Sequence, residues 1–136
     1  MNDRYLFKAK RVDNGEWVIG QYVNTCYPKD CKKTGHFIVE YPNHFHEIYT
    51  STLCQCTGLK DKNGKLIWEN DICDRKEEYP EIVKYNNSDW TLDYSYSKGK
   101  ESGYCYCNLG FYALERKYVE VIGNIFDNPE LLESEE

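Results

Sequence analysis

Short stretches in which apolar and polar residues alternate recur along the chain, and turn-forming residues separate them. Residues 5–10 and 16–23 alternate on either side of Asp13-Asn14-Gly15, where Asn and Gly accept the positive φ angles of a tight turn. This arrangement predicts a β-hairpin, with a bulge at Gly20. Further strands are predicted at residues 37–41, 53–57, 72–73, 81–85, 90–94 and 118–122.

Other segments alternate less clearly. Residues 24–36 contain Pro, Gly, Asn and Asp and are predicted to form a loop. Residues 43–52 fit either a short strand or a turn, and residues 104–114 fit one strand or two. Near the C-terminus, Asn128 as N-cap and Pro129 at the first helical position predict one helical turn. No segment has a sustained 3.6-residue apolar period, so a helical bundle is excluded.

The densest group of local signals lies in residues 57–73. Asn63-Gly64 between polar neighbours predicts a tight turn. The apolar segment Leu66-Ile67-Trp68 follows, and a second turn leads into the strand that begins at Ile72. We therefore expect Trp68 and Ile72 to anchor this stretch in the core.

Residues 58–72, with the sequence GLKDKNGKLIWENDI, resemble the signature of the YopX family of phage and prophage proteins. Residues 119–132 are similar to the family's ending, and residues 6–10 and 15–20 are similar to its opening. Three blocks in the same order span nearly the whole chain, so the resemblance is specific. Asn70 stands where the family usually has glycine, and Asn also tolerates a left-handed turn conformation.

The resemblance implies an all-β, mainly β-sheet protein without enzymatic activity. Residues 1–69 would form a β-rich N-terminal part, and residues 70–136 would form an SH3-like barrel with a short capping turn; the alternative is that the two parts form one integrated unit. The closed barrel itself would span about residues 70–126, with apolar side chains inside it. The residues available for this interior are Val83, Tyr85, Trp90, Leu92, Tyr112, Leu114, Val119 and Val121.

Charge is unevenly distributed over the 136 residues, whose formal net charge is -6. Residues 1–70 hold 10 Lys and Arg against 8 Asp and Glu, a net charge of +2, and residues 71–136 hold 7 against 15, a net charge of -8. An acidic C-terminal half repels phosphate, which disfavours nucleic-acid binding by the predicted barrel. The lysines within residues 29–33 and 60–65 serve solubility or form a patch for an anionic partner.

The composition is that of a folded protein in a reducing compartment. The aromatic content of 15% is too high for a disordered chain, and 7 cysteines, an odd number, do not suit a secreted disulfide framework. The N-terminus has no apolar segment of the kind that signal peptides contain, and no apolar run approaches the ~20 residues of a membrane span. We expect a protein of the bacterial host cytoplasm that has no membrane partner.

The cysteines raise the question of a metal site, because Cys54 and Cys56 form one close pair and Cys105 and Cys107 another. Structural zinc sites prefer pairs separated by two to four residues. Residues two apart in a strand face the same side, and buried cysteines behave as small apolar residues. We therefore predict core thiols and no metal or cofactor, with a metal site as the alternative. No nucleophile, base or phosphate loop has a recognisable spacing, so no catalytic residue is predicted.

Tyrosines around a predicted loop are the most suggestive surface feature. They flank Lys98-Gly99-Lys100 in alternating positions, so each pair would lie on one face of a hairpin. Such a face either packs on the core or recognises a partner through its aromatic rings. The four candidate binding residues are Tyr94, Tyr96, Tyr104 and Tyr106.

Taken together, these features predict a non-enzymatic interaction module encoded by a phage or prophage. Its partner would be an unknown host or phage protein. The alternatives are a small barrel that binds nucleic acid, which the acidic charge disfavours, and an accessory protein that assembles with copies of itself through exposed strands.

Overall fold

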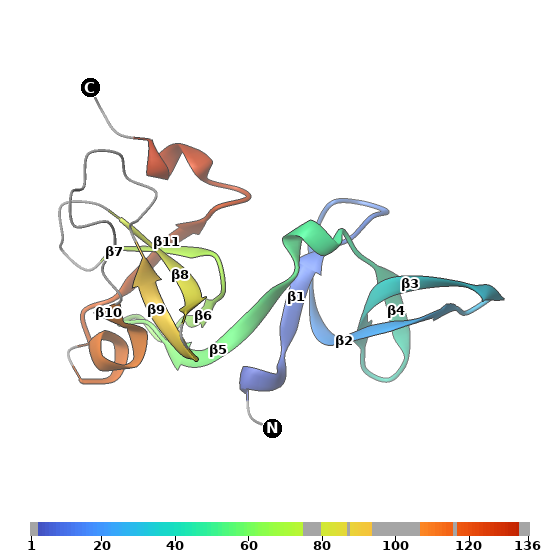
Figure 1. The fold of residues 1–136 in the computed structure, drawn as a ribbon, viewed down its shortest axis with the longest axis horizontal. Helices are drawn as coiled ribbons and strands as arrows, with labels where there is room; N and C mark the ends of the chain where they lie inside the picture. Colours follow the sequence, from blue (N-terminus) through green and yellow to red (C-terminus); the bar gives the residue numbers. More distant parts are fainter. Residues whose placement is uncertain (1–2, 75–79, 87, 94–106, 116, 134–136) are drawn as a thin grey trace. The chain divides into compact units, whose positions relative to one another are not determined.

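The computed structural model describes residues 3–74, 80–86, 88–93, 107–115 and 117–133. Contacts divide the chain into two compact units, Met1–Cys56 and Thr57–Glu136 (Figure 1). Strands and turns make up nearly all of the described residues, so the predicted mainly β class is confirmed. No helix in the described part of the chain is long and apolar enough to cross a membrane.

The first unit is built from antiparallel strands. The order in its sheet is β4-β3-β2-β1-β5-β6, and β5 begins in the first unit and ends in the second. Two single turns of 3-10 helix, η1 and η2, connect the strands. The bounds are η1 (Asp3–Tyr5), β1 (Phe7–Lys10), β2 (Trp17–Tyr27), β3 (Asp30–Glu40), β4 (His44–Glu47), η2 (Thr50–Thr52), β5 (Cys54–Lys60) and β6 (Leu66–Trp68).

The predicted first hairpin is confirmed. β1 and β2 pair with Lys10 opposite Trp17, and Gly15 in the turn between them has a φ of 73°. Side chains in the two strands alternate between the two faces of the sheet, and one face packs into a small core. Ala9 and Val18 lie opposite each other on this face, and both are buried. The buried residues of this core are Ala9, Val18, Ile38 and Ile48, and Phe7, Tyr22 and Leu53 pack against them.

The predicted loop at residues 24–36 is wrong, because these residues lengthen two strands instead. β2 continues to Tyr27, β3 begins at Asp30, and the two pair up to the tight turn between them. The register shifts between Cys26 and Tyr27, next to the tip, and the remaining residues are rich in the β-branched and aromatic types that favour strands. Gly35 leaves space for the Tyr27 ring, which lies 3.1 Å from where a Cβ at position 35 would be.

Gly20 is required by a close backbone approach. A Cβ added there would lie 2.3 Å from the carbonyl oxygen of Val39, and backbone cannot rotate away as a flexible side chain can. The registers of β2 with β1 and with β3 show no shift at this position, so the predicted bulge is wrong.

Replacing Gly20 with alanine is therefore expected to destabilise the first unit by about 1–3 kcal/mol, the usual range for an overpacked site. Urea unfolding measures this loss. Gly110→Ala is the matched control, because its added Cβ would meet a side-chain oxygen of Asn108 at 3.2 Å, which can shift. Equal losses in the two variants would show that the contact with Val39 is not the cause.

The second unit contains a five-stranded antiparallel sheet. Its order is β10-β9-β8-β7-β11, and a π-helical turn, η3, lies between β10 and β11. The predicted strand or strands at residues 104–114 thus include this turn. The bounds are β7 (Asp71–Asp74), β8 (Glu81–Asn86), β9 (Asp89–Asp93), β10 (Cys107–Asn108), η3 (Phe111–Glu115), β11 (Glu120–Asn124) and the 3-10 turn η4 (Pro129–Leu132).

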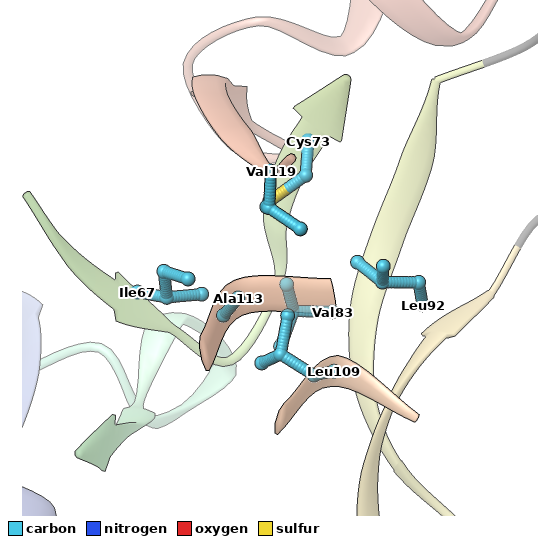
Figure 2. Close-up of a cluster of buried hydrophobic side chains, with 7 residues drawn as sticks. All are labelled: Ile67, Cys73, Val83, Leu92, Leu109, Ala113 and Val119. Atoms are coloured by element: carbon cyan, nitrogen blue, oxygen red, sulfur yellow. The ribbon is translucent and has the colours of Figure 1, made fainter. Parts of the chain in front are cut away.

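Figure 2 shows the core of the second unit, in which side chains from β6, β7, β8, β9, η3 and the segments beside them converge. The buried members are Ile67, Cys73, Val83, Leu92, Leu109, Ala113 and Val119, and Leu59, Trp90, Tyr112 and Val121 pack against them. Most of the predicted interior is therefore confirmed. Tyr85 and Leu114 are exceptions, with 57% and 61% of their surface exposed.

These two errors have different physical causes. Tyr85 lies beside the turn between β8 and β9, where its ring packs edge-on against Trp90 with 5.0 Å between centroids. Leu114 lies in η3, whose helical geometry directs successive side chains around an axis and not to alternate faces. The prediction assumed a strand at Leu114.

The predicted closure into an SH3-like barrel is not confirmed, because neither sheet closes on itself in the described residues. The division between the units also lies earlier than the predicted 69/70 boundary, at Cys56/Thr57. Ile67 explains the difference, since it belongs to the same buried cluster as Val83 and Leu92 of the second unit.

Two predictions concern turns, one at Asn70 and one at the helical turn that begins at Pro129. Asn70 has a φ of 70°, so it does adopt the left-handed conformation for which the family uses glycine. The predicted helical turn is present as η4, with Pro129 at its start. Asn128 stands at the N-cap position, but its side chain accepts a hydrogen bond from the backbone of Asn124 in β11 and does not cap the turn.

Candidate interaction surface on the β2–β3 arm

The tyrosines singled out in the sequence, Tyr94, Tyr96, Tyr104 and Tyr106, lie outside the described residues, as does Cys105. Their role in recognition stays a prediction. The described parts of both units therefore have to be searched for other sites.

The described cysteines of β5 and β7 are buried. Cys54 and Cys56 are buried on one face of β5, as predicted for core thiols. Burial raises the pKa of the Cys73 thiol well above its ordinary value, which disfavours the reactive thiolate. Cys26 and Cys31 are free thiols near the tip of the β2–β3 hairpin. Among the described residues, no three metal-ligating side chains gather.

Two histidines of the first unit are held by internal hydrogen bonds. His36 Nδ1 lies 2.6 Å from the Tyr22 hydroxyl, and the two rings stack with an angle of 1° between their planes. His46 Nε2 lies 2.7 Å from the Glu40 carboxylate. These contacts fix β2, β3 and β4 side by side, so we assign both histidines a structural role.

The β2–β3 hairpin forms an extension that we call the arm, residues 24–36. β1 pairs with β2 only as far as Gly20, and β4 pairs with β3 only from Phe37 to Glu40. Beyond these points β2 and β3 pair with each other, as Figure 1 shows where the hairpin continues past β4. The described arm is thus a two-stranded ribbon.

Aromatic rings cover one side of the ribbon and its base. Tyr27 and Phe45 both pack edge-on against Phe37, with centroid separations of 5.4 and 5.9 Å. The Tyr27 hydroxyl donates a 2.6 Å hydrogen bond to Glu47, and this bond raises the pKa of the phenol. Phe37 is only 3% exposed, so two partly exposed rings cover it on the solvent side of a thin sheet.

A groove of about 440 Å³ lies on the sheet surface at the base of the arm. Ile19 and Tyr41 contribute large apolar side chains to it that are 48% and 96% exposed. Its lining residues are Leu6, Ile19, Gly20, Gln21, Val39, Glu40, Tyr41 and Pro42.

A second hollow, of about 540 Å³, lies at the tip of the arm and is lined by Tyr27, Pro28, Lys29, Asp30 and Lys33. We call the exposed and half-buried apolar side chains at the base and tip of the arm the arm face. It consists of Ile19, Tyr27, Val39, Tyr41 and Phe45.

The sequence analysis missed this surface because it predicted a loop over the whole of residues 24–36. The turn itself lies only between Tyr27 and Asp30. The β-branched and aromatic residues in 21–27 and 34–39 are the signal that would have predicted two long strands.

Comparison with protein families gives a match over nearly the whole chain. A family model described as YopX protein matches residues 6–133. A search of the curated proteins finds no match. Because the family match covers nearly the whole chain, this protein belongs to the YopX family.

Proposed function

We propose that the protein is a non-enzymatic interaction module, encoded by a phage or prophage, that binds another protein molecule in the bacterial cytoplasm through its arm face. The observation that supports this function is the exposure of large apolar side chains beside the base of the β-ribbon. Tyr41 is 96% exposed and Phe45 42% exposed, although both belong to an ordered antiparallel sheet or its adjoining turn. Aromatic residues of this kind are enriched in protein interfaces.

The absence of catalysis is part of the same proposal. Support comes from the described histidines His36 and His46, which are held by Tyr22 and Glu40, and from the buried thiol of Cys73. In the described residues neither imidazole is hydrogen-bonded to a serine or cysteine side chain, so the nucleophile–base pair of covalent catalysis is not formed there.

An SH3-like barrel in the second unit also stays a proposal. Its support is the strand order β10-β9-β8-β7-β11, in which consecutive strands form a meander and the last strand returns beside the first. A five-stranded barrel with this order closes when the two edge strands approach each other.

Site-specific photo-crosslinking tests the proposed function. A benzophenone amino acid at Tyr41 or Phe45 is expected to capture a discrete protein partner in cells that carry the phage. The matched control position is Tyr118 of the second unit, which is 51% exposed and lies outside the arm face. Equal crosslinking from Tyr118, or no discrete product from Tyr41 and Phe45, would contradict binding through the arm face.

A further inference from the structure

The outer edge of β2 in the arm presents backbone groups that face away from β3. Ile48 donates a hydrogen bond to the His36 carbonyl, so the backbone polar groups of His36 point away from β2. His36 is opposite Asn24, and antiparallel pairs alternate between bonded and non-bonded. Asn24 therefore also points its N–H and C=O away from β3, and Tyr22 and Cys26 do the same at two-residue spacing.

The side chains along this edge of β2 are not of the kinds that prevent another strand from pairing with it. Residues 21–27, QYVNTCY, contain no charge and no proline. The opposite edge of the arm has Lys32 and Lys33, and lysine is a common means of preventing strands from pairing at an edge. The two edges of one ribbon thus differ, and only the β2 edge is open to an incoming strand.

The geometry points to a second copy of this chain as the occupant: two arms pair antiparallel through their β2 edges, about a two-fold axis at Asn24. This inference goes beyond the proposed function, because it uses the outer edge of β2 and not the side chains of the arm face. The pairing puts Tyr22 opposite Cys26 of the other copy and Val23 opposite Thr25, and it forms about six backbone hydrogen bonds. Uncharged and β-branched pairs of this kind stabilise a sheet.

The length of the free edge suits this arrangement. β1 occupies the β2 edge up to Gly20, and the arm turns at Pro28. Three residues lie between Asn24 and each of these limits, so the tip of one arm reaches the start of β1 in the other copy. The contact is isologous, because each copy supplies the same edge, and it closes as a dimer.

Sedimentation velocity over a wide range of protein concentration tests the inference on the full chain. We expect a reversible dimer in the wild-type protein. Asn24→Pro removes the outward N–H without removing a β2–β3 hydrogen bond, and it should raise the dimer dissociation constant at least about tenfold. Thr34→Pro is the matched control, since Thr34 shares the alternation of His36 and points its N–H to the opposite edge. It should leave the dimer unchanged.

A charge exchange at the two-fold axis gives a second test that does not depend on proline. Asn24→Lys and Asn24→Asp each put like charges opposite each other and should each be monomeric, whereas a mixture of the two should form a heterodimer. A wild-type protein that stays monomeric, or a dimer that survives Asn24→Pro and both charge variants, would overturn the inference. Crosslinking of a different protein from Tyr41 would still support the proposed function in that case.

Discussion

Replacing Trp68 with alanine is expected to cost about 3–5 kcal/mol of unfolding free energy, the range found when a large aromatic ring is removed from a core. Trp68 is 6% exposed at the end of β6. Its backbone N–H donates a 2.8 Å hydrogen bond to the Asp71 carboxylate, which fixes the turn into β7. The alanine variant leaves a cavity beside this turn. Urea denaturation of the purified protein measures the loss.

Tyr118→Ala provides the comparison for Trp68→Ala. Tyr118 belongs to the same unit but is 51% exposed, so its loss is expected to stay below about 1 kcal/mol. If the two variants lost similar amounts of stability, the Trp68 ring would not be a core anchor.

The regular strands of this protein could be predicted from alternation because they have one buried and one exposed face. β1 and the first half of β2 are examples: Ala9 and Val18 are buried, whereas their neighbours are less so. The strands around Val83 and Leu92 were predicted from their β-branched and aromatic residues, because consecutive residues in them, such as Ile82 and Val83, are both buried. The turn at Asn63-Gly64 was specified by residue type, and Gly64 has a φ of 83°.

The candidate interaction surface could not be predicted in the same way. Tyr27, Phe37 and Phe45 are distant in the sequence and meet only because the strands pair in a particular register. Phe45 lies in β4, part of the segment that fitted either a strand or a turn. The groove beside Tyr41 depends on the missing side chain of Gly20, which sequence alone interprets as a bulge.

The role of Asp61 was also hidden in the sequence, where it is one polar residue before a turn. In the structure its side chain is 6% exposed and accepts three hydrogen bonds of 2.9 Å, from the backbone N–H groups of Asn63, Lys65 and Val121. The first two close the turn, and the third joins that turn to β11. One carboxylate thus connects two segments that are sixty residues apart in the sequence.

Removing this carboxylate is expected to produce the second large effect. Asp61→Ala leaves three backbone donors without their acceptor, and hydrogen bonds to a charged group contribute about 1.5–3 kcal/mol each. We expect a loss of about 3 kcal/mol or more in urea denaturation, because water replaces part of the bonding. Glu130→Gln, at an exposed position, should change stability by less than about 0.5 kcal/mol.

Acid titration distinguishes the charge of Asp61 from its shape. Burial acts to raise the pKa of the carboxyl, but the three backbone donors outweigh it, so the pKa lies below the ordinary value of 3.8. The contribution of the charge to stability is therefore complete above the unfolded pKa of 3.8, and it disappears as the pH falls through the folded value. The difference in unfolding free energy between the wild-type protein and Asp61→Asn should be constant from about pH 7 to about pH 5 and should shrink below about pH 4. If this difference in unfolding free energy stayed constant down to the acid transition, the lost charge would not be the cause. The Asp61→Asn variant would then be less stable because the geometry of its amide does not suit the three backbone donors.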